Sequence, residues 1–530
     1  MSNRSTDALF QLVKSLEKSE KRNFKLFVKR NSATEDLKII QLFDALDKMA
    51  DYDEKLLLAK AKSISKQQLS NIKAHLYKQI LSSLRLIKEE DNIDIYLHEQ
   101  MDYARILFNK GLYLQSLKVL ERLKETAKAY HQLTYLQQAL FFEKKIETLF
   151  ITRSMQDRAD KLSAEANLVN AQLSLVNQLS NLSLQLYSWY IKHGHARNEK
   201  DVKEIQSFFE KHLPAEVLNT NAGLPDRLGF YEKLYLYQCY VWFAFIRQDF
   251  LQYYRYSQKW VDLFSVFPGL LKVETASYIK GMHNLMGAHF NLMNQEKLAQ
   301  CIKQFEQFTR QKHLEENENN RILAYQYLYA ARINLYFLQG TFTKGLRMVP
   351  FLEDMLKEYG LYLDTHRVLV FYYKIACLYF GSGNNEKAID YLNRIINQKG
   401  DLRTDLQCYS RLLNLIAHYE LGNFDLLEYL IKSVYRYMAK MENLSKVEEE
   451  MFVFLRHSFH VGARALKPEF EKLLVKLKKY EGNALESRAF VYLDVISWLE
   501  SKISGVNVQD VIREKFLLGK RGKVNRVGSL

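Results

Sequence analysis

The sequence contains few of the residues that interrupt regular secondary structure, with 5 prolines and 20 glycines among 530 residues. A protein of several strands needs turn residues every 8 to 12 residues or so, whereas long helices need far fewer interruptions. No segment shows the sustained two-residue alternation of a half-buried strand. The composition therefore predicts an all-α protein, and 48% hydrophobic residues are enough for a large core.

Cysteine is also scarce, and its spacing argues against a metal or redox site. The four cysteines, Cys239, Cys301, Cys377 and Cys408, are 62, 76 and 31 residues apart. No Cys-x-x-Cys pair exists, so we expect buried, apolar thiols and no metal site. No apolar run approaches the roughly 18 residues of a membrane span, and Met1–Asp7 is too polar to open a secretory signal. We expect no membrane span and a cytoplasmic location.

The net charge of +15 is concentrated at the two ends of the sequence. Residues 1–90 carry 18 basic and 12 acidic side chains, and residues 513–530 carry 6 and 1. The 422 residues between them have a net charge of only +4. Basic ends can contact nucleic acid or acidic lipid, but a solvated tail and a lysine-rich helix surface explain them more simply.

One segment carries a helix-pair pattern, in which small and aromatic residues surround a Gly-Asn turn. Ala376 lets a second helix approach, Gly383 can adopt a positive φ at the helix end, and Ala388 leaves room for Tyr379. The full pattern is Tyr372, Ile375, Ala376, Tyr379, Gly383, Asn384, Ala388, Ile389, Leu392 and Ile395. Here the sequence resembles the tetratricopeptide repeat (TPR), although Gly400 stands where that family usually has a proline after the second helix.

The pattern recurs along the chain, although with a longer period than the family's. Related turns occur near positions 111, 248, 294, 340, 383 and 422, and the last five are 46, 46, 43 and 39 residues apart. The family period is about 34 residues, so each helix pair is longer here. The resemblance covers roughly residues 95–440. It implies a right-handed α-α superhelix of TPR-like helix pairs.

The sequence suggests four parts. Residues 1–90 form a basic N-terminal helical module, a cap or a helix-turn-helix-like head, and residues 91–211 form N-terminal helical repeats. A break over His212–Gly229, which contains two prolines and two glycines, precedes a TPR-like block at 230–505. Residues 506–530 are expected to be a basic flexible tail.

No segment carries a convincing catalytic, cofactor or metal motif. Gly381-Ser382-Gly383 lacks the preceding strand and following Gly-Lys of a phosphate loop, and a repeat turn explains it. His193 and His195 supply only two ligands, with no carboxylate or thiol spaced to complete a metal site. We therefore expect a protein that is not an enzyme and needs no cofactor.

Aromatic residues are abundant, with 34 tyrosines and 31 phenylalanines, and they crowd one predicted helix. Tyr253, Tyr254, Arg255 and Tyr256 lie there, followed by Trp260. Aromatic and arginine side chains are typical of peptide-binding grooves and base-stacking surfaces, although packing between helices explains most of them equally well. These four residues are our candidate partner-binding site, on the concave side of the repeats.

A second candidate lies in residues 55–74, which loosely fit a helix-turn-helix. Buried positions would be Leu58, Ala59, Ile64, Leu69 and Ile72. The outward-facing Lys66, Gln67, Asn71 and Lys73 are then candidate contacts to nucleic acid. Lys62 occupies a normally apolar position, and the second helix continues far beyond the usual length. A structural cap on the repeats is the simpler interpretation.

The sequence thus favours a non-enzymatic scaffold or adaptor that binds a protein or peptide partner on the concave face of a helical-repeat solenoid. The alternative is a DNA-binding transcriptional regulator with a helix-turn-helix-like head and a TPR-like sensor domain. The identity of the partner is not encoded in any motif.

Overall fold

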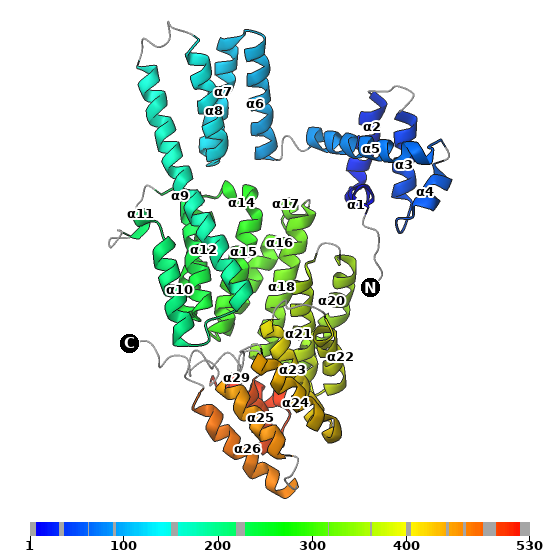
Figure 1. Cartoon of the computed structure of the whole chain (residues 1–530), viewed down its shortest axis with the longest axis vertical. Helices are drawn as coiled ribbons and strands as arrows, with labels where there is room; N and C mark the ends of the chain where they lie inside the picture. The colour runs from blue at the N-terminus through cyan, green and yellow to red at the C-terminus, as the bar shows by residue number, and fades with distance from the viewer. Residues whose placement is uncertain are drawn as a thin grey trace. The chain divides into compact units, whose positions relative to one another are not determined.

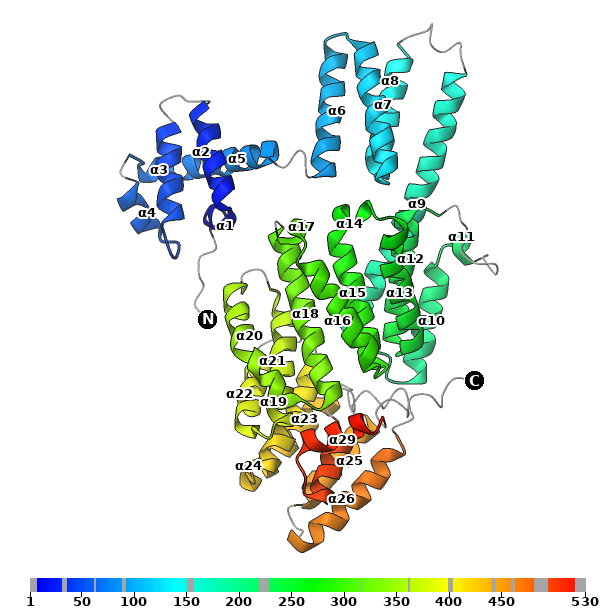
Figure 2. The same cartoon turned by 180° about the vertical axis from the view of Figure 1, so that it is seen from behind.

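The computed structural model describes residues 7–30, 36–61, 63–87, 92–149, 157–218, 228–315, 317–360, 363–398, 404–440, 445–458, 463–480 and 494–519. Every regular element within these residues is helical, and they contain no strand (Figures 1 and 2). The predicted all-α fold is confirmed. The chain divides into two compact units, Met1–Asn170 and Ala171–Leu530.

The first helices of unit 1 form a small domain with its own core. They are α1 (Ala8–Ser15), α2 (Lys18–Arg30), α3 (Asp36–Asp47), α4 (Glu54–Lys60) and α5 (Lys66–Ile87). The Asp7 and Asp53 carboxylates cap α1 and α4 by accepting backbone N–H groups of the first turn. Phe24 and Phe43 are fully buried, with ring centroids 4.8 Å apart. These five helices enclose one apolar core of their own.

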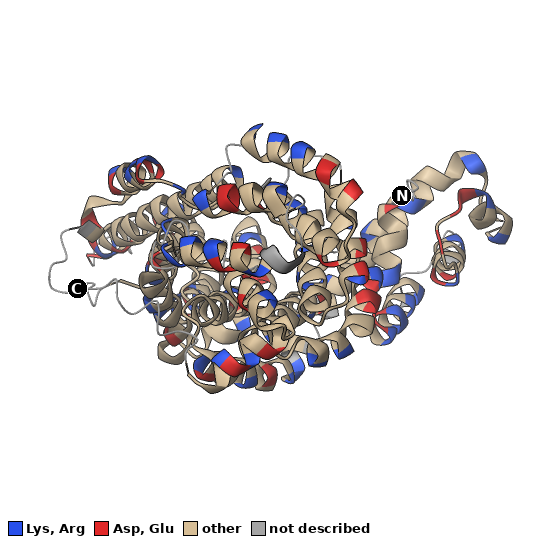
Figure 3. Ribbon diagram, turned by 90° about the horizontal axis from the view of Figure 1, so that it is seen from below, with Lys and Arg blue, Asp and Glu red and all other residues tan. Residues whose placement is uncertain are grey.

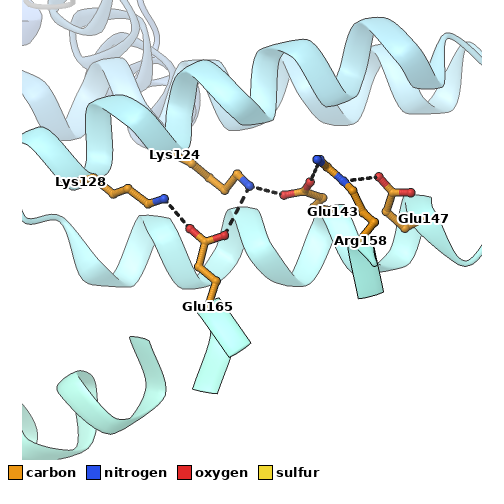
Figure 4. A network of polar contacts seen from close by, with 6 residues as sticks. All are labelled: Lys124, Lys128, Glu143, Glu147, Arg158 and Glu165. Atoms are coloured by element: carbon orange, nitrogen blue, oxygen red, sulfur yellow. Dashed lines mark hydrogen bonds and ion pairs between the residues drawn. The ribbon is translucent and has the colours of Figure 1, made fainter. Parts of the chain in front are cut away.

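Unit 1 contains three further helices, α6 (Ile93–Asn109), α7 (Tyr113–Ala129) and α8 (Leu133–Glu147), and α7 runs antiparallel to the other two. The first part of α9 (Arg158–His193) joins α7 and α8 through a network of charged side chains (Figure 4). The Lys124 Nζ lies 2.5 Å from a carboxylate oxygen of the buried Glu143, which also pairs with Arg158.

Unit 2 consists mainly of successive helix pairs. It begins with the end of α9, α10 (Glu199–His212) and α11 (Ala215–Leu218). The pairs that follow are α12 (Phe230–Ile246) with α13 (Phe250–Val266), α15 (Thr275–Asn291) with α16 (Gln295–Thr309), and α18 (Glu318–Gln339) with α19 (Phe342–Gly345), η2 (Leu346–Met348) and α20 (Val349–Glu358). Short helices α14 (Leu270–Val273) and α17 (Lys312–Glu315) lie between pairs.

The same arrangement continues toward the C-terminus of unit 2. The next helices are α21 (Thr365–Gly381) with α22 (Asn385–Ile396), α23 (Thr404–Glu420) with α24 (Phe424–Lys440), and α25 (Lys446–Ser458) with α26 (Ala463–Lys478), followed by α28 (Val495–Ser504) and α29 (Val508–Leu517). Consecutive helices pack antiparallel (Figures 1 and 2). This architecture is compatible with a helical-repeat solenoid.

The turns between paired helices share one backbone motif. A residue with positive φ ends the first helix at Gln248, Met293, Gly340, Gly383 and Gly422, which are 45, 47, 43 and 39 residues apart. In each turn the next N–H donates to the carbonyl five residues earlier, as Asn384 does to Tyr379 at 2.9 Å. This bond belongs to the Schellman motif, which satisfies carbonyls at a helix end. The predicted recurrence of turns is confirmed at these positions.

The predicted domain boundaries differ from the two units. The division at Asn170 falls inside α9, because the end of α9 shares a buried apolar core with α10 and α12. Leu186, Phe209 and Phe243 belong to this core, and Ala196 donates its N–H to the Ile246 carbonyl at 2.9 Å. The predicted break at 212–229 therefore lies within unit 2, and residues 219–227 of it are outside the described residues.

The start of the expected flexible tail is also helical. Helix α29 buries Ile512 and packs on α18, because Val508 and Ile512 lie one helical turn apart on its inner face. Gly340, with φ 62°, lies so close to α29 that a Cβ atom would be 2.5 Å from the Arg513 nitrogen. Residues 520–530 of the predicted tail are outside the described residues.

All four cysteines are buried, and none of them forms a disulfide. Burial raises the pKa of the Cys301 thiol to about 11 and that of the Cys377 thiol to about 12, and it also raises the pKa of Cys239. Within the described residues, no helix has the length and apolar composition needed to cross a membrane.

Candidate ligand-binding cavity

Unit 2 contains a cavity of about 590 Å³, lined mainly by the first helices of successive pairs. Side chains from α12, α15, α18 and α21 form most of its wall, and the end of α9 and the start of α23 complete it. The second helices contribute Tyr253 of α13 alone. The volume lies within the range of about 300 to 1,000 Å³ that is usual for ligand sites.

Aromatic rings cover one part of this wall. Tyr187 and Trp242 lie with ring centroids 5.0 Å apart, and the Lys280 ammonium is 5.7 Å from each centroid. His283 stacks on Tyr327, with 3.9 Å between centroids and 15° between planes. Such surfaces hold apolar or planar groups and position cations by cation–π attraction.

Lys374 is the most deeply buried cation of the cavity, with 7% of the residue exposed. Its ammonium donates a hydrogen bond to Asn334 and lies 5.7 Å from the Phe337 ring centroid. It forms no ion pair with any described carboxylate. Burial lowers the pKa of Lys374 to about 8, so the ammonium is poorly compensated by the protein itself.

Two further cations lie near Lys374. Burial and then the positive charge of Arg367 lower the pKa of Lys280, which likewise has no ion pair among the described residues. The Arg367 guanidinium lies 3.1 Å from an Asp364 carboxylate oxygen and donates to the Gln326 amide oxygen at 2.8 Å. The acidic residues of the lining are Asp364 and Asp405.

His283 marks the point where these charges converge. Burial lowers its pKa to about 3, with further contributions from the positive charges of Lys374, Arg367 and Lys280. The imidazole is therefore neutral near pH 7, and it senses three cations from two different helices. This part of the cavity has a positive potential.

Two buried amides add hydrogen-bond donors. Gln326 is 2% exposed and Asn284 is 7% exposed, and the NH₂ group of each has no hydrogen-bond partner. The Arg367 guanidinium can only donate hydrogen bonds, so its partner on Gln326 is the amide oxygen. The NH₂ group of Gln326 therefore has no part in this contact. A buried donor without a partner is costly unless a ligand or water satisfies it.

The predicted partner-binding residues point in different directions around α13. Tyr253 is buried, lines the cavity and donates its hydroxyl hydrogen to Asn284 at 3.2 Å. Tyr254 packs beside the His289 ring, Arg255 is exposed, and Tyr256 stacks on Tyr240. Consecutive residues of a helix are about 100° apart, so the four side chains cannot share one surface.

Sequence reasoning missed the three cavity cations Lys280, Arg367 and Lys374. A signal for one of them was present, since Lys374 is the only charged residue in the apolar stretch 368–380. A lone charge on a helix that is otherwise apolar points to a buried functional position. Lys280 and Arg367 carry no comparable signal, because their convergence depends on how α15, α18 and α21 come together around the cavity.

The N-terminal domain of helices α1 to α5, here called the head, places α4, a short connection and α5 in a helix-turn-helix-like order. Lys66, Gln67 and Asn71 are exposed on α5, whereas Lys73 is half-buried and contacts Asp7 and the Tyr52 hydroxyl. Ile64 and Leu69 are buried as expected.

The predicted register of α4 was wrong by about one residue. Leu57 is buried and Leu58 is half-buried where Leu58 and Ala59 were expected, and Ala59 is exposed. Lys62 lies outside the described residues. Helix α5 is 22 residues long and contains no acidic residue.

The weaker sequence candidates have structural roles. His195 is buried, with Nδ1 2.7 Å from the Phe245 carbonyl oxygen, and Gly381-Ser382-Gly383 forms the end of α21 and its turn. No cluster of three or more potential metal ligands occurs in the described parts of the chain.

Comparison with models of protein families, with curated proteins and with solved structures finds no match to this chain. The cavity and the head therefore have to be interpreted from their own chemistry.

Proposed function

We propose that the chain is a non-enzymatic interaction module, whose TPR-like helix pairs bind a peptide segment of a partner protein in the cavity of unit 2. The observation that carries this proposal is the cavity's wall, which combines aromatic planes with converging cations across several first helices. Aromatic and arginine side chains dominate the binding energy of protein interfaces. Buried thiols are consistent with a reducing, cytoplasmic compartment.

Selection from a library of short random-sequence peptides tests this function with full-length protein. We expect selected peptides to bind the native chain and to lose binding when Ala330, which lines the cavity, is replaced by Phe. The matched control is Ala439→Phe on the exposed side of α24. If the selected peptides bind the native chain, Ala330→Phe and Ala439→Phe equally well, the binding surface lies outside the cavity.

A second candidate function is DNA binding by the head, and one observation favours it. Helix α5 presents Lys66, Gln67 and Asn71 to solvent without an acidic residue anywhere on the helix. Amide and lysine side chains on a helix can reach base edges and phosphates in the major groove. Lys73 is already engaged by Asp7, so it is the weakest member of the predicted set.

A duplex-binding titration at several salt concentrations tests this candidate. If α5 docks on DNA, Lys66→Ala flattens the log–log salt dependence by about 0.9, the contribution of one phosphate contact. The exposed Lys432 of α24 provides the control, since Lys432→Ala leaves the slope unchanged. Binding that vanishes at physiological salt in every variant would reflect only the basic ends of the chain.

A further inference from the structure

We propose that the cavity recognises a carboxylate of an acidic peptide, held between Lys280, Arg367 and Lys374. This inference rests on the proposed peptide-binding function and adds the chemistry of the ligand. The three side chains line the same cavity, and all three act on His283.

The first argument is the imbalance of charge inside the cavity. Lys280 and Lys374 have no ion pair among the described residues, since Asp364 is paired with Arg367 and Asp405, the other acidic residue of the lining, pairs with neither lysine. Buried charges in proteins are normally paired, because removing an ammonium from water without a counter-ion is costly. A carboxylate placed among these cations would supply the missing negative charge.

The second argument is the set of unused hydrogen-bond donors. The NH₂ groups of Gln326 and Asn284 are without partners although both residues are more than nine-tenths buried. Ammonium, guanidinium and amide NH₂ groups are all donors, and a carboxylate is an acceptor with about four lone-pair sites. The donor set therefore fits an anion with several acceptor positions.

The third argument concerns the part of the ligand that carries the carboxylate. Tyr187, Trp242 and Tyr327 line the cavity beside the cations, and Lys280 lies over the first two rings. These rings would pack against an apolar or aromatic residue adjacent to the acidic group. We therefore expect a bound peptide to contain an acidic residue next to an apolar or aromatic one.

The test uses the peptides selected above, measured by fluorescence anisotropy with the full-length protein. Each peptide is resynthesised with its acidic side chains changed to amides and, separately, with an amidated C-terminus. We expect one of these changes to weaken binding by about tenfold or more, because it leaves the cavity's cations uncompensated. The form that loses affinity identifies a side-chain or a C-terminal carboxylate.

Variants of the protein show whether the cavity's cations are responsible. In Lys374→Met and Arg367→Gln, we expect amidation of the same peptide to reduce the binding affinity much less than in the native protein. Each variant already lacks one of the positive charges that the peptide carboxylate would contact. Lys303→Met on the exposed face of α16 is the control and keeps the full loss. Circular dichroism and thermal melting of each variant establish that it is folded.

The outcomes separate the two proposals. Peptides that are blocked by Ala330→Phe but bind equally well after amidation would overturn the carboxylate and leave the peptide-binding function standing. An amidation loss that persists undiminished in Lys374→Met and Arg367→Gln would also overturn it. If no selected peptide binds more weakly to Ala330→Phe than to the native protein, both proposals fail.

Discussion

At the scale of single residues, the most informative side chain is Lys374, a buried ammonium in an apolar stretch of α21. Its pKa of about 8 lies below the ordinary lysine value of 10.5. Below pH 8 the lysine is protonated in both the folded and the unfolded chain, so the folded state bears the full cost of the buried charge. That cost decreases as the pH rises from 8 toward 10.5, because the unfolded chain then binds more protons.

We therefore predict that Lys374→Met stabilises the protein without ligand. The free energy of unfolding at pH 7 should rise by about 1 to 3 kcal/mol, partly offset by the lost hydrogen bond to Asn334. Urea denaturation followed by circular dichroism at pH 7 and pH 10 measures the effect, which should be smaller at pH 10. A variant that is equally destabilised at both pH values would show that the ammonium stabilises the fold.

The sequence alone could not predict which side chains of α13 line the cavity. Tyr253, one of the predicted partner-binding residues, lines the cavity, but the pattern could not show that Tyr254 and Tyr256 pack against His289 and Tyr240 instead. The direction of each side chain depends on where the neighbouring helices lie. That information is not contained in the spacing along one helix.

At the scale of elements, the recurrent turn was more predictable than the helices it joins. Asn and Gly residues at helix ends have a local physical reason, since they accept positive φ or cap the next helix. Gln248 and Met293 adopt the same positive φ without being glycine, which explains why the predicted spacing was off by a residue at the second turn. At both turns the residue that follows, Asp249 or Asn294, caps the next helix with its side chain.

We predict that Ala376→Leu and Ala388→Leu destabilise the pair α21–α22. Both residues are fully buried, and α21 and α22 are closely packed, so added methylenes must displace neighbours. The expected loss is about 1 to 3 kcal/mol each. Thermal melting beside the exposed control Ala439→Leu measures it, and a melting temperature unchanged in both variants would contradict the helix packing described above.

The charged network of unit 1 gives a second prediction for elements. Glu143 is 1% exposed and pairs with Lys124 and Arg158. Glu143→Ala therefore leaves Lys124 with only Glu165, at 3.8 Å, and Arg158 with only Glu147. We expect a loss of about 2 to 4 kcal/mol. The matched control is Glu428→Ala, which removes a highly exposed ion pair with Lys432 and should cost no more than about 0.5 kcal/mol. If Glu143→Ala and Glu428→Ala lower the free energy of unfolding equally in a denaturant titration, burial does not explain the contribution of Glu143.

At the scale of the whole molecule, the helical class followed directly from the scarcity of proline and glycine, but the division into units did not. Acidic and basic residues are interspersed along the helices (Figure 3), so no change in charge marks the division after Asn170. The division falls within α9, where the sequence continues a regular helix. Only the cores formed on each part of α9 reveal it, and they depend on contacts distant in sequence.

The two units predict more than one unfolding transition. We expect calorimetry of the full chain to show a transition that Glu143→Ala shifts and a separate one that Ala388→Leu shifts, because the two substitutions lie in different cores. A single transition displaced by either substitution would mean that the units unfold together.

The four buried cysteines have a consequence for following such transitions. All of them lie in unit 2, and none occurs before Cys239 in the sequence. A buried thiol of raised pKa reacts with an alkylating reagent only when its surroundings open, since the thiolate is the reactive form. Each modified cysteine therefore records an opening of unit 2 and is silent about unit 1. Mass spectrometry of labelled peptides would turn the chain's own thiols into a map of where the helix pairs separate first.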